Sequence, residues 1–303
     1  MGMNRTQYAN VAIFMMVALF SAMLNVPAVH AAEKAVKTHE LCYKFKPGET
    51  IRYEVEHMAT VDTRISATDQ KAKSRSRSTM VWKFIDAEPG HFKFIQSLEK
   101  VDLWQQAEGQ DEIRYNSETD ETPPAAYERV SETLEQPVAT ITIDDCGELI
   151  QREGNGQTPD LGFGGIVVVL PPKPIPVGHQ WYVGDTLRVR DRNKQVKEIS
   201  VRLKHELKSV KTGVATISVQ TQVLTPINDA QLESQLVQRL SRGEIKFDLI
   251  AGRVIEKRLD WDESVVGFNG PESSMKYLAR FTESLVANET ATANNADAES
   301  VNR

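Results

Sequence analysis

Hydrophobic and polar residues alternate with a period of two along much of this chain. Between Ile51 and Ile65 the odd positions are mainly apolar and the even positions mainly polar or charged. One apolar face at this period predicts a half-buried antiparallel strand. At about 3.3 Å per residue such a strand spans roughly 50 Å, so we expect it to coil with its sheet or to bend at a bulge.

The same pattern predicts the other elements of the first half. Apolar positions run from Phe92 to Leu98 and then change phase at Val101, which predicts a bulge near Glu99–Lys100. Further expected elements are short strands at Leu41–Phe45 and Ile166–Leu170, a strand around Met80–Phe84, a polar, turn-rich segment at Gly109–Thr122, a short helix at Ala125–Leu134 and a hairpin at Val138–Arg152.

A proline-rich segment, Leu170–Trp181, separates two runs of strand-like sequence. Its four prolines are incompatible with a central strand or a helix interior, so we expect a stiff, extended connector. Beyond it, alternating strands, a turn at Gly213, a helix at Asp229–Leu240 with Asn228 or Asp229 as its cap, and a hairpin at Gly252 repeat the order of the first half. The repeat predicts a duplicated unit, although any antiparallel meander would give a similar pattern.

These patterns predict a mainly β protein with two short helices. We expect a duplicated, strongly curved antiparallel sheet that resembles a half-barrel. The expected organisation is a first half at residues 32–153, a Gly/Pro-rich connector at 154–177, a second half at 178–286 and a disordered tail at 287–303, which has few apolar residues.

Residues 1–31 have the pattern of a secretory signal peptide. Arg5 precedes an apolar run from Val11 to Leu24, and Val29 and Ala31 are small residues at the positions that determine cleavage. The apolar run is shorter than the roughly 20 residues of a spanning helix. We therefore expect cleavage after Ala31 and a secreted or periplasmic protein that does not span a membrane; an uncleaved membrane anchor is the alternative.

The charge balance is acidic. The whole chain has 36 basic and 42 acidic residues, and removal of Arg5 with the signal leaves 35 against 42, a net charge of −7. This balance argues against a nucleic-acid partner. The basic run Lys71–Arg77 is interleaved with serine and is typical of a solvated strand end or loop.

Cys42 and Cys146 are the two cysteines of the chain. An even number of cysteines in an exported protein predicts a disulfide between them. Two buried free thiols are the alternative.

The sequence predicts no catalytic, cofactor or metal site. The histidines lack the spacing of metal ligands, and His57 and His205 lie on apolar strand faces, where a buried histidine with satisfied hydrogen bonds is the usual case. The paired acids Asp144–Asp145 suit a hairpin turn, and Asp260 and Asp262 suit a solvated strand face, with a weak calcium site or glycoside hydrolysis as alternatives.

Two segments resemble a known family. The hairpin Val138–Ile150 and the segment Leu170–Trp181, with its Leu-Pro-x-x-Pro-x-x-Val-Gly-x-x-Trp pattern, are similar to a family of uncharacterised exported bacterial proteins. That resemblance implies an exported chain of β-strands and no assigned activity. At the level of fold alone, the expected curved sheet also resembles periplasmic LolA-like lipoprotein carriers.

A strongly curved sheet has a concave face that two short helices cover only in part. We therefore expect an exported, non-catalytic protein that binds a hydrophobic small molecule or an apolar segment of an envelope protein on this face. A structural envelope module with a fully filled core is the alternative, and a hydrolase is the third. The oligomeric state is left open. The expected inner-face residues are Tyr53, Val55, His57, Trp82, Phe84, Phe92, Phe94, His205, Tyr277 and Phe281.

Overall fold

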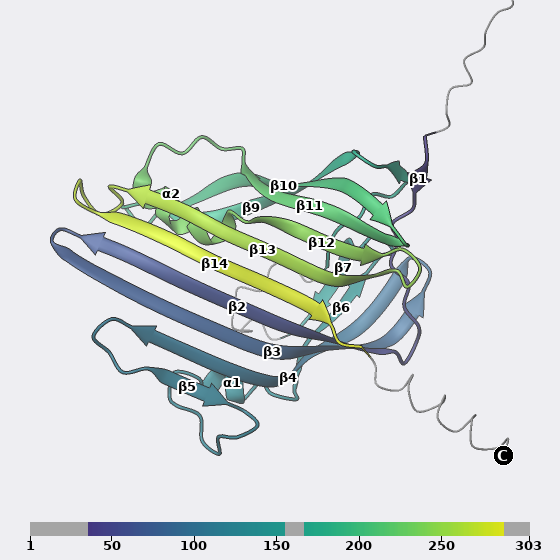
Figure 1. Cartoon of the computed structure of the whole chain (residues 1–303), viewed down its shortest axis with the longest axis horizontal. Helices are drawn as coiled ribbons and strands as arrows, with labels where there is room; N and C mark the ends of the chain where they lie inside the picture. Colours follow the sequence, from purple (N-terminus) through teal and green to yellow (C-terminus); the bar gives the residue numbers. More distant parts are fainter. Residues whose placement is uncertain (1–35, 155–166, 288–303) are drawn as a thin grey trace, which may run out of the picture. The chain divides into compact units, whose positions relative to one another are not determined.

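One large antiparallel sheet dominates the structure, a computed structural model that describes residues 36–154 and 167–287 (Figure 1). All of these residues except Val36 belong to the unit that begins at Lys37. The mainly β class with two short helices is confirmed. Within the described residues no helix has the length and apolar character needed to cross a membrane.

The first half contributes six strands and one helix to this architecture. Its strands β2, β3 and β4 form a meander, and α1 precedes the hairpin of β6 and β7. The bounds are β2 (Thr50–Ile65), β3 (Thr68–Glu88), β4 (His91–Ala107), β5 (Ile113–Asn116), α1 (Glu128–Ser131), β6 (Pro137–Ile143) and β7 (Leu149–Glu153).

The second half follows the same order of connections. A meander of β9, β10 and β11 leads through α2 and a 3-10 turn, η1, to β12 and β13, and β14 then joins β13 to β2. The bounds are β9 (Gln180–Arg190), β10 (Val196–Lys211), β11 (Val214–Val223), α2 (Ala230–Leu236), η1 (Val237–Arg239), β12 (Arg242–Asp248), β13 (Arg253–Val266) and β14 (Ser274–Leu285).

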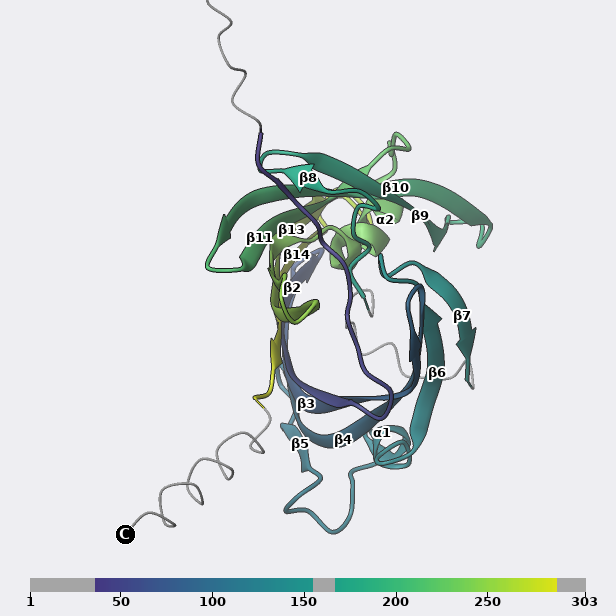
Figure 2. The ribbon, with the colours of Figure 1, turned by 90° about the vertical axis from the view of Figure 1, so that its right-hand side faces the viewer.

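The strands of the sheet lie in the order β7-β6-β4-β3-β2-β14-β13-β12-β11-β10-β9, with β5 paired to β4. Viewed after a quarter turn, the sheet curls around an interior, as Figure 2 shows. Both helices pack on the concave face, because Val130 of α1 joins a cluster with Leu98 and Val101, and Leu236 of α2 joins one with Ile199 and Val201. Both halves therefore share one order of connections, and duplication of the unit stays a prediction.

Local signals located several features correctly. The register of β3 against β4 shifts between Thr79 and Met80, whose partners are Lys100 and Leu98, so the predicted bulge lies at Glu99. Asp229 caps α2, and its carboxylate accepts the backbone N–H of Gln231 at 2.9 Å. The basic run that begins at Lys71 lies on the exposed end of β3.

Other predicted elements were wrong or too long. Leu41–Phe45 does not pair as a strand, and the nearby β1 (Thr38–His39) pairs with β8 (Ile175–Pro176) inside the proline connector. Of the strand predicted at Ile166–Leu170, Ile166 lies outside the described residues and Val168–Leu170 is not a strand. A strand, β5, lies inside the segment predicted to be turns. The helix α1 is one turn long, since residues 125–127 and 132–134 of the expected helix are not helical.

The segment Leu41–Phe45 passes through the interior of the sheet instead (Figure 2). The Tyr43 N–H donates to Asp145 O at 2.9 Å, and the Lys44 N–H donates to Gly252 O at 3.0 Å, so the segment is fixed to the turns of both hairpins. The Tyr43 hydroxyl donates to Val168 O at 3.0 Å and accepts the Val168 N–H at 3.1 Å. Backbone groups that no strand pairs are thereby satisfied inside the core.

Candidate functional site

The concave face divides into a filled part and an open part. Phe45, in the interior segment, stacks on Phe84 with ring centroids 4.1 Å apart and meets Phe92 edge-on at 5.2 Å. Trp82 stacks on Phe94 at 4.9 Å. At that end the protein's own aromatic side chains fill the concave face.

A cavity of about 430 Å³ lies in the other part of the concave face. The volume falls within the range of about 300–1,000 Å³ that is usual for small-molecule sites. Residues of β2, β3, β9 to β14, η1 and the segment Val167–Val169 surround it. Its apolar walls are Ala59, Val61, Val167, Val168, Val169, Val183, Leu203, Val219, Ile245 and Leu259.

The strand registers explain why these apolar side chains converge. Leu259 lies opposite Gly243, Gly243 opposite Val219, and Val219 opposite His205, so one row crosses four neighbouring strands on one face. Gly243 has no side chain in this row, and a Cβ there would come within 1.9 Å of Arg258 O. Curvature of the sheet turns the row into the wall of a hollow.

Two aromatic–histidine pairs border the cavity. The His57 and Trp261 rings meet edge-on at 6.0 Å, and the His205 ring stacks on Trp181 at 5.1 Å. Burial lowers the pKa of His57, and burial also lowers the pKa of His205 to about 4, against a smaller rise from a hydrogen bond to the Leu203 backbone. Both imidazoles are therefore neutral at pH 7.

Two buried polar atoms of this cavity have no hydrogen-bond partner among the described residues. They are Nδ1 of His205 and Nε1 of Trp261, in residues that are 3% and 7% exposed. His205 is buried as expected, but its hydrogen bonds are not all satisfied, because Nδ1 has no partner among the described residues. A buried donor or acceptor without a partner costs about 1–3 kcal/mol, and side chains shield both atoms from the open part of the cavity.

A buried ion pair adjoins the same cavity. Nζ of Lys257 lies 3.2 Å from Oε2 of Glu283, and the two side chains are 5% and 11% exposed. The ammonium also lies 5.2 Å from the centre of the Phe281 ring. Lys257 lines the cavity, so a cationic group is held in a largely apolar wall.

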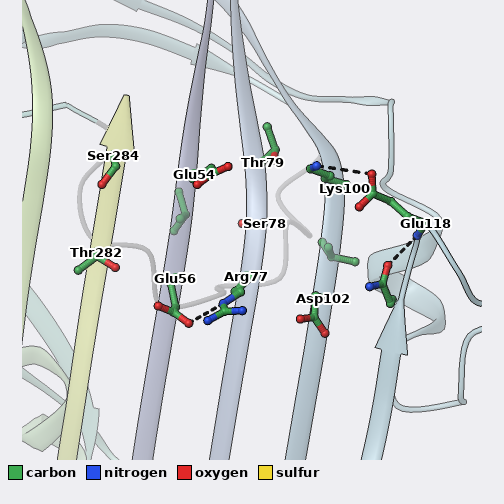
Figure 3. Close-up of a pocket in the computed structure, with 13 residues that line it drawn as sticks. Glu54, Glu56, Arg77, Ser78, Thr79, Lys100, Asp102, Glu118, Thr282 and Ser284 are labelled. Carbon is green, nitrogen blue, oxygen red and sulfur yellow. Dashed lines mark hydrogen bonds and ion pairs between the residues drawn. The ribbon is translucent and has the colours of Figure 1, made fainter. Parts of the chain in front are cut away.

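A second hollow, of about 570 Å³, lies on the opposite, convex face of the sheet (Figure 3). It is larger than the concave cavity, but four of its charged side chains pair with one another, and the buried Ser78 Oγ in its lining has no partner among the described residues. Arg77 pairs with Glu56 at 2.6 Å, and Lys100 pairs with Glu118 at 3.5 Å. Exposed pairs of this kind are typical of a solvated surface. The concave cavity is therefore the better candidate site.

The acidic groups of the sequence serve structural roles. Oδ1 of Asp144 accepts the N–H groups of Cys146 and Glu148 at 2.9 and 2.8 Å, which is turn chemistry, although Asp144, Asp145 and Cys146 present ligand atoms within 4.8 Å of one another. Asp260 on the convex face pairs with Arg280 at 2.6 Å and with Arg258 at 3.1 Å.

The two cysteines lie close together but are not bonded in the structure. Tyr43 follows Cys42 and donates its N–H to Asp145, which precedes Cys146, at 2.9 Å. Burial raises the pKa of Cys146 to about 11, and the carboxylates of Asp144 and Asp145 add to the rise. The disulfide stays a prediction, and the Tyr43–Asp145 contact brings the two cysteine-bearing segments side by side.

The expected inner-face residues all lie on the concave side, but they separate into two groups. His57, His205 and Tyr277 line the cavity. The others belong to the filled core: Tyr53, Val55, Trp82, Phe84, Phe92, Phe94 and Phe281.

Sequence reasoning missed Lys257 and Trp261. Trp261 lies between Asp260 and Asp262 in the sequence. The alternation of β13 places it on the face opposite to these two acids, but no functional role followed from that position alone. Lys257 interrupts the apolar face of β13, and Glu283 interrupts the apolar face of β14. Two charges at inward positions of adjacent strands were the signal for a buried pair.

Comparisons with known proteins give little further information. No family model matches the chain, and no curated protein matches it. A solved structure that concerns lipid–protein interactions in lipovitellin matches 80% of this chain at 11% identity, with a TM-score of 0.46. This chain spans about a quarter of that one, since the match covers 26% of it.

Proposed function

We propose that this protein is exported and binds a hydrophobic small molecule in the concave cavity. One observation supports the proposal above all others: a 430 Å³ hollow on the concave face has walls formed mainly by valine, leucine, isoleucine and alanine side chains. The role is binding rather than catalysis. Export rests on the apolar run at Val11–Leu24 and the small residues before Ala32.

The proposal explains why the sheet is filled at one end and hollow at the other. The segment Leu41–Phe45 covers the aromatic end, and Tyr43 positions Val168 at the border of the cavity. In a structural module with a fully filled core, the protein's own side chains would also fill the part of the concave face that holds the cavity. The hollow therefore favours the binding role over the structural alternative.

Fluorescence of the neutral dye N-phenyl-1-naphthylamine tests the proposal. We expect the dye to brighten in the protein and 1-decanol to displace it, because burial of apolar surface stabilises binding by about 25 cal/mol per Å². Val219→Phe, which adds volume inside the cavity, should weaken dye binding at least tenfold. Ser284→Phe on the convex face is the matched control and should leave binding unchanged.

Two results would contradict the proposal. One is dye binding that Val219→Phe does not weaken, and the other is the absence of dye binding to correctly folded protein. Export has a separate test, because N-terminal sequencing of protein recovered outside the cytoplasm should begin at Ala32 and not at Met1.

A further inference from the structure

A single row of side chains crosses the convex face of the sheet, and the proposed binding function does not account for it. Seven residues, one from each of seven neighbouring strands, lie directly opposite one another in turn; from β12 to β5 they are Arg242, Asp260, Arg280, Met58, Arg75, Trp104 and Arg114. Directly opposite residues of antiparallel strands share one face of the sheet. All seven line one hollow of about 830 Å³. We call these residues the arginine row.

Arginine occupies every second position of the arginine row. Neighbouring strands lie about 4.8 Å apart, so consecutive arginines are about 10 Å apart and the arginine row extends over about 29 Å. Two sugars of an extended, β-linked glycan span about the same length as the distance between consecutive arginines. A glycan with one carboxylate in each disaccharide would therefore place its carboxylates in step with the arginines.

The positive charge on this part of the convex face is confined to a line. Four arginines against Asp260 give the arginine row a net charge of +3. The next row on one side has two basic and three acidic residues, a net charge of −1, and consists of Glu244, Arg258, Thr282, Glu56, Arg77, Asp102 and Asn116. The next row on the other side has one residue of each sign, Lys73 and Asp262. A line of positive charge suits a linear polyanion better than the flat surface of an anionic membrane.

The hollow around the arginine row also differs in sign from the convex hollow near Glu54. Its lining has five basic and two acidic residues, whereas the lining of the other hollow has two basic and four acidic residues. The sign of the charge therefore changes along the strands of one face. An anionic ligand is favoured at the arginine row and disfavoured near Glu54.

The ion pairs of the arginine row leave N–H donors available. Arg242 has no ion-pair partner among the described residues. The other three arginines each pair with one carboxylate, at 2.9, 2.9 and 2.6 Å: Arg75 with Asp102, Arg114 with Glu112, and Arg280 with Asp260. These pairs use one or two of the three nitrogens of each guanidinium. A guanidinium has five N–H donors, so such a pair orients the group and still allows it to bind a second carboxylate.

Trp104 adds an aromatic surface between two arginines. Arg75 lies opposite it on β3, and Arg114 lies opposite it on β5. Its Nε1 donates to Oε2 of Glu112 at 2.9 Å, which fixes the orientation of the half-buried indole. The C–H groups of a pyranose ring pack on an indole face, whereas a bare phosphate or carboxylate gains nothing from it. The arginine row therefore combines contacts for acidic groups with a contact for a sugar ring.

We propose that the arginine row binds a linear acidic polysaccharide that has one carboxylate in each disaccharide. The polysaccharide runs across the strands from β12 to β5, with a carboxylate at each arginine and a sugar ring on Trp104. This binding does not depend on the proposed function, because the arginine row lies on the convex face and the cavity lies on the concave face.

Fluorescence anisotropy of an end-labelled hyaluronan octasaccharide tests the proposal. This probe has a glucuronate carboxylate in each of its disaccharides, one for each arginine. It should bind the protein in about 0.15 M NaCl, where the Debye length of about 8 Å is shorter than the spacing of the arginines. Arg242→Gln should weaken binding about threefold, as expected for the loss of one exposed contact between opposite charges, and the further substitution Arg114→Gln should bring the loss to about tenfold.

Arg188→Gln is the matched control. It removes the same charge from an exposed pair on β9, where Arg188 lies 3.3 Å from Glu198, outside the hollow of the arginine row. This variant should leave the affinity for the octasaccharide unchanged. Chitohexaose, a neutral β-linked oligosaccharide, should not compete with the octasaccharide.

Three results would overturn the inference. The first is the absence of octasaccharide binding to the folded wild-type protein, and the second is binding that Arg242→Gln and Arg114→Gln together leave unchanged. The third is equal affinity for chitohexaose. Vesicles of phosphatidylglycerol that bind the protein while the octasaccharide does not would assign the arginine row to a membrane surface and overturn the polysaccharide as well. The octasaccharide should not displace N-phenyl-1-naphthylamine, so these results leave the test of the concave cavity separate.

Discussion

Lys257 and Glu283 form an ion pair across β13 and β14, with Nζ and Oε2 3.2 Å apart inside the core. Removing both charges from water carries a large desolvation penalty, which the attraction between them and their other contacts offset. The pair lies between the aromatic end of the concave face and its cavity. Lys257 lines that cavity, so the pair is part of the wall on which the proposed ligand rests.

Glu283→Gln should destabilise the fold strongly. The substitution leaves the Lys257 ammonium buried without its carboxylate, and loss of one partner of a buried pair lowers the free energy of unfolding by about 3–5 kcal/mol. Lys246→Gln is the control, because it breaks the exposed 2.6 Å pair with Glu256 and should lower that free energy by less than about 1 kcal/mol. Urea denaturation measures both, and equal effects would show that burial does not matter here.

Gly147→Ala should be far more harmful than Gly90→Ala. Both glycines have a positive φ, +82° and +76°, so alanine at either position is strained by about 1–2 kcal/mol. At Gly147 a Cβ would also lie 2.6 Å from Val168 O and 2.7 Å from Cε2 of Tyr43, whereas nothing lies within 4 Å at Gly90. We expect a loss of about 2–4 kcal/mol for Gly147→Ala. Similar melting temperatures for the two variants would disprove the close approach of the interior segment.

His205 should make stability depend on pH below neutrality. Burial lowers its folded pKa from the ordinary 6.5 to about 4, so the unfolded chain binds the proton first. The contribution of neutral His205 to the free energy of unfolding is fully present above about pH 6.5. It falls by about 3 kcal/mol as the pH decreases to about 4. His205→Gln should flatten this part of the profile. An unchanged slope between wild type and variant in urea titrations at several pH values would refute the assignment.

The Cys42–Cys146 disulfide can be tested by thiol titration. The backbone contact between Tyr43 and Asp145 holds the two cysteines in neighbouring segments, and an exported protein is in a compartment that permits oxidation. Protein denatured without reductant should therefore show no reactive thiol. Two reactive thiols per chain would mean that the bond does not form.

Local signals predicted the long strands, the bulge at Glu99 and the cap at Asp229, because alternation and capping depend on residues that are adjacent in the sequence. The apolar pattern of Leu41–Phe45 is equally strong, yet this segment pairs with no strand. Its backbone partners are Asp145 and Gly252, more than a hundred residues away. No local pattern specifies a contact of that range.

The sequence predicted which residues lie on the concave face, but not which part of that face contains the cavity. Alternation placed Phe84 and His57 on one face, and both lie there. The sequence could not indicate that the first is covered by Phe45 while the second borders a hollow, because this depends on where a distant segment passes over the sheet. Which part of a curved face stays open is a tertiary property.

A crystal structure grown with 10-bromo-1-decanol tests the central claim most directly. The account predicts an anomalous bromine peak inside the concave cavity, with density for the alkyl chain beside Leu203 and Val219. A bromine peak confined to the convex hollow near Glu54, or a cavity closed by the protein's own side chains with no bound alcohol, would contradict it.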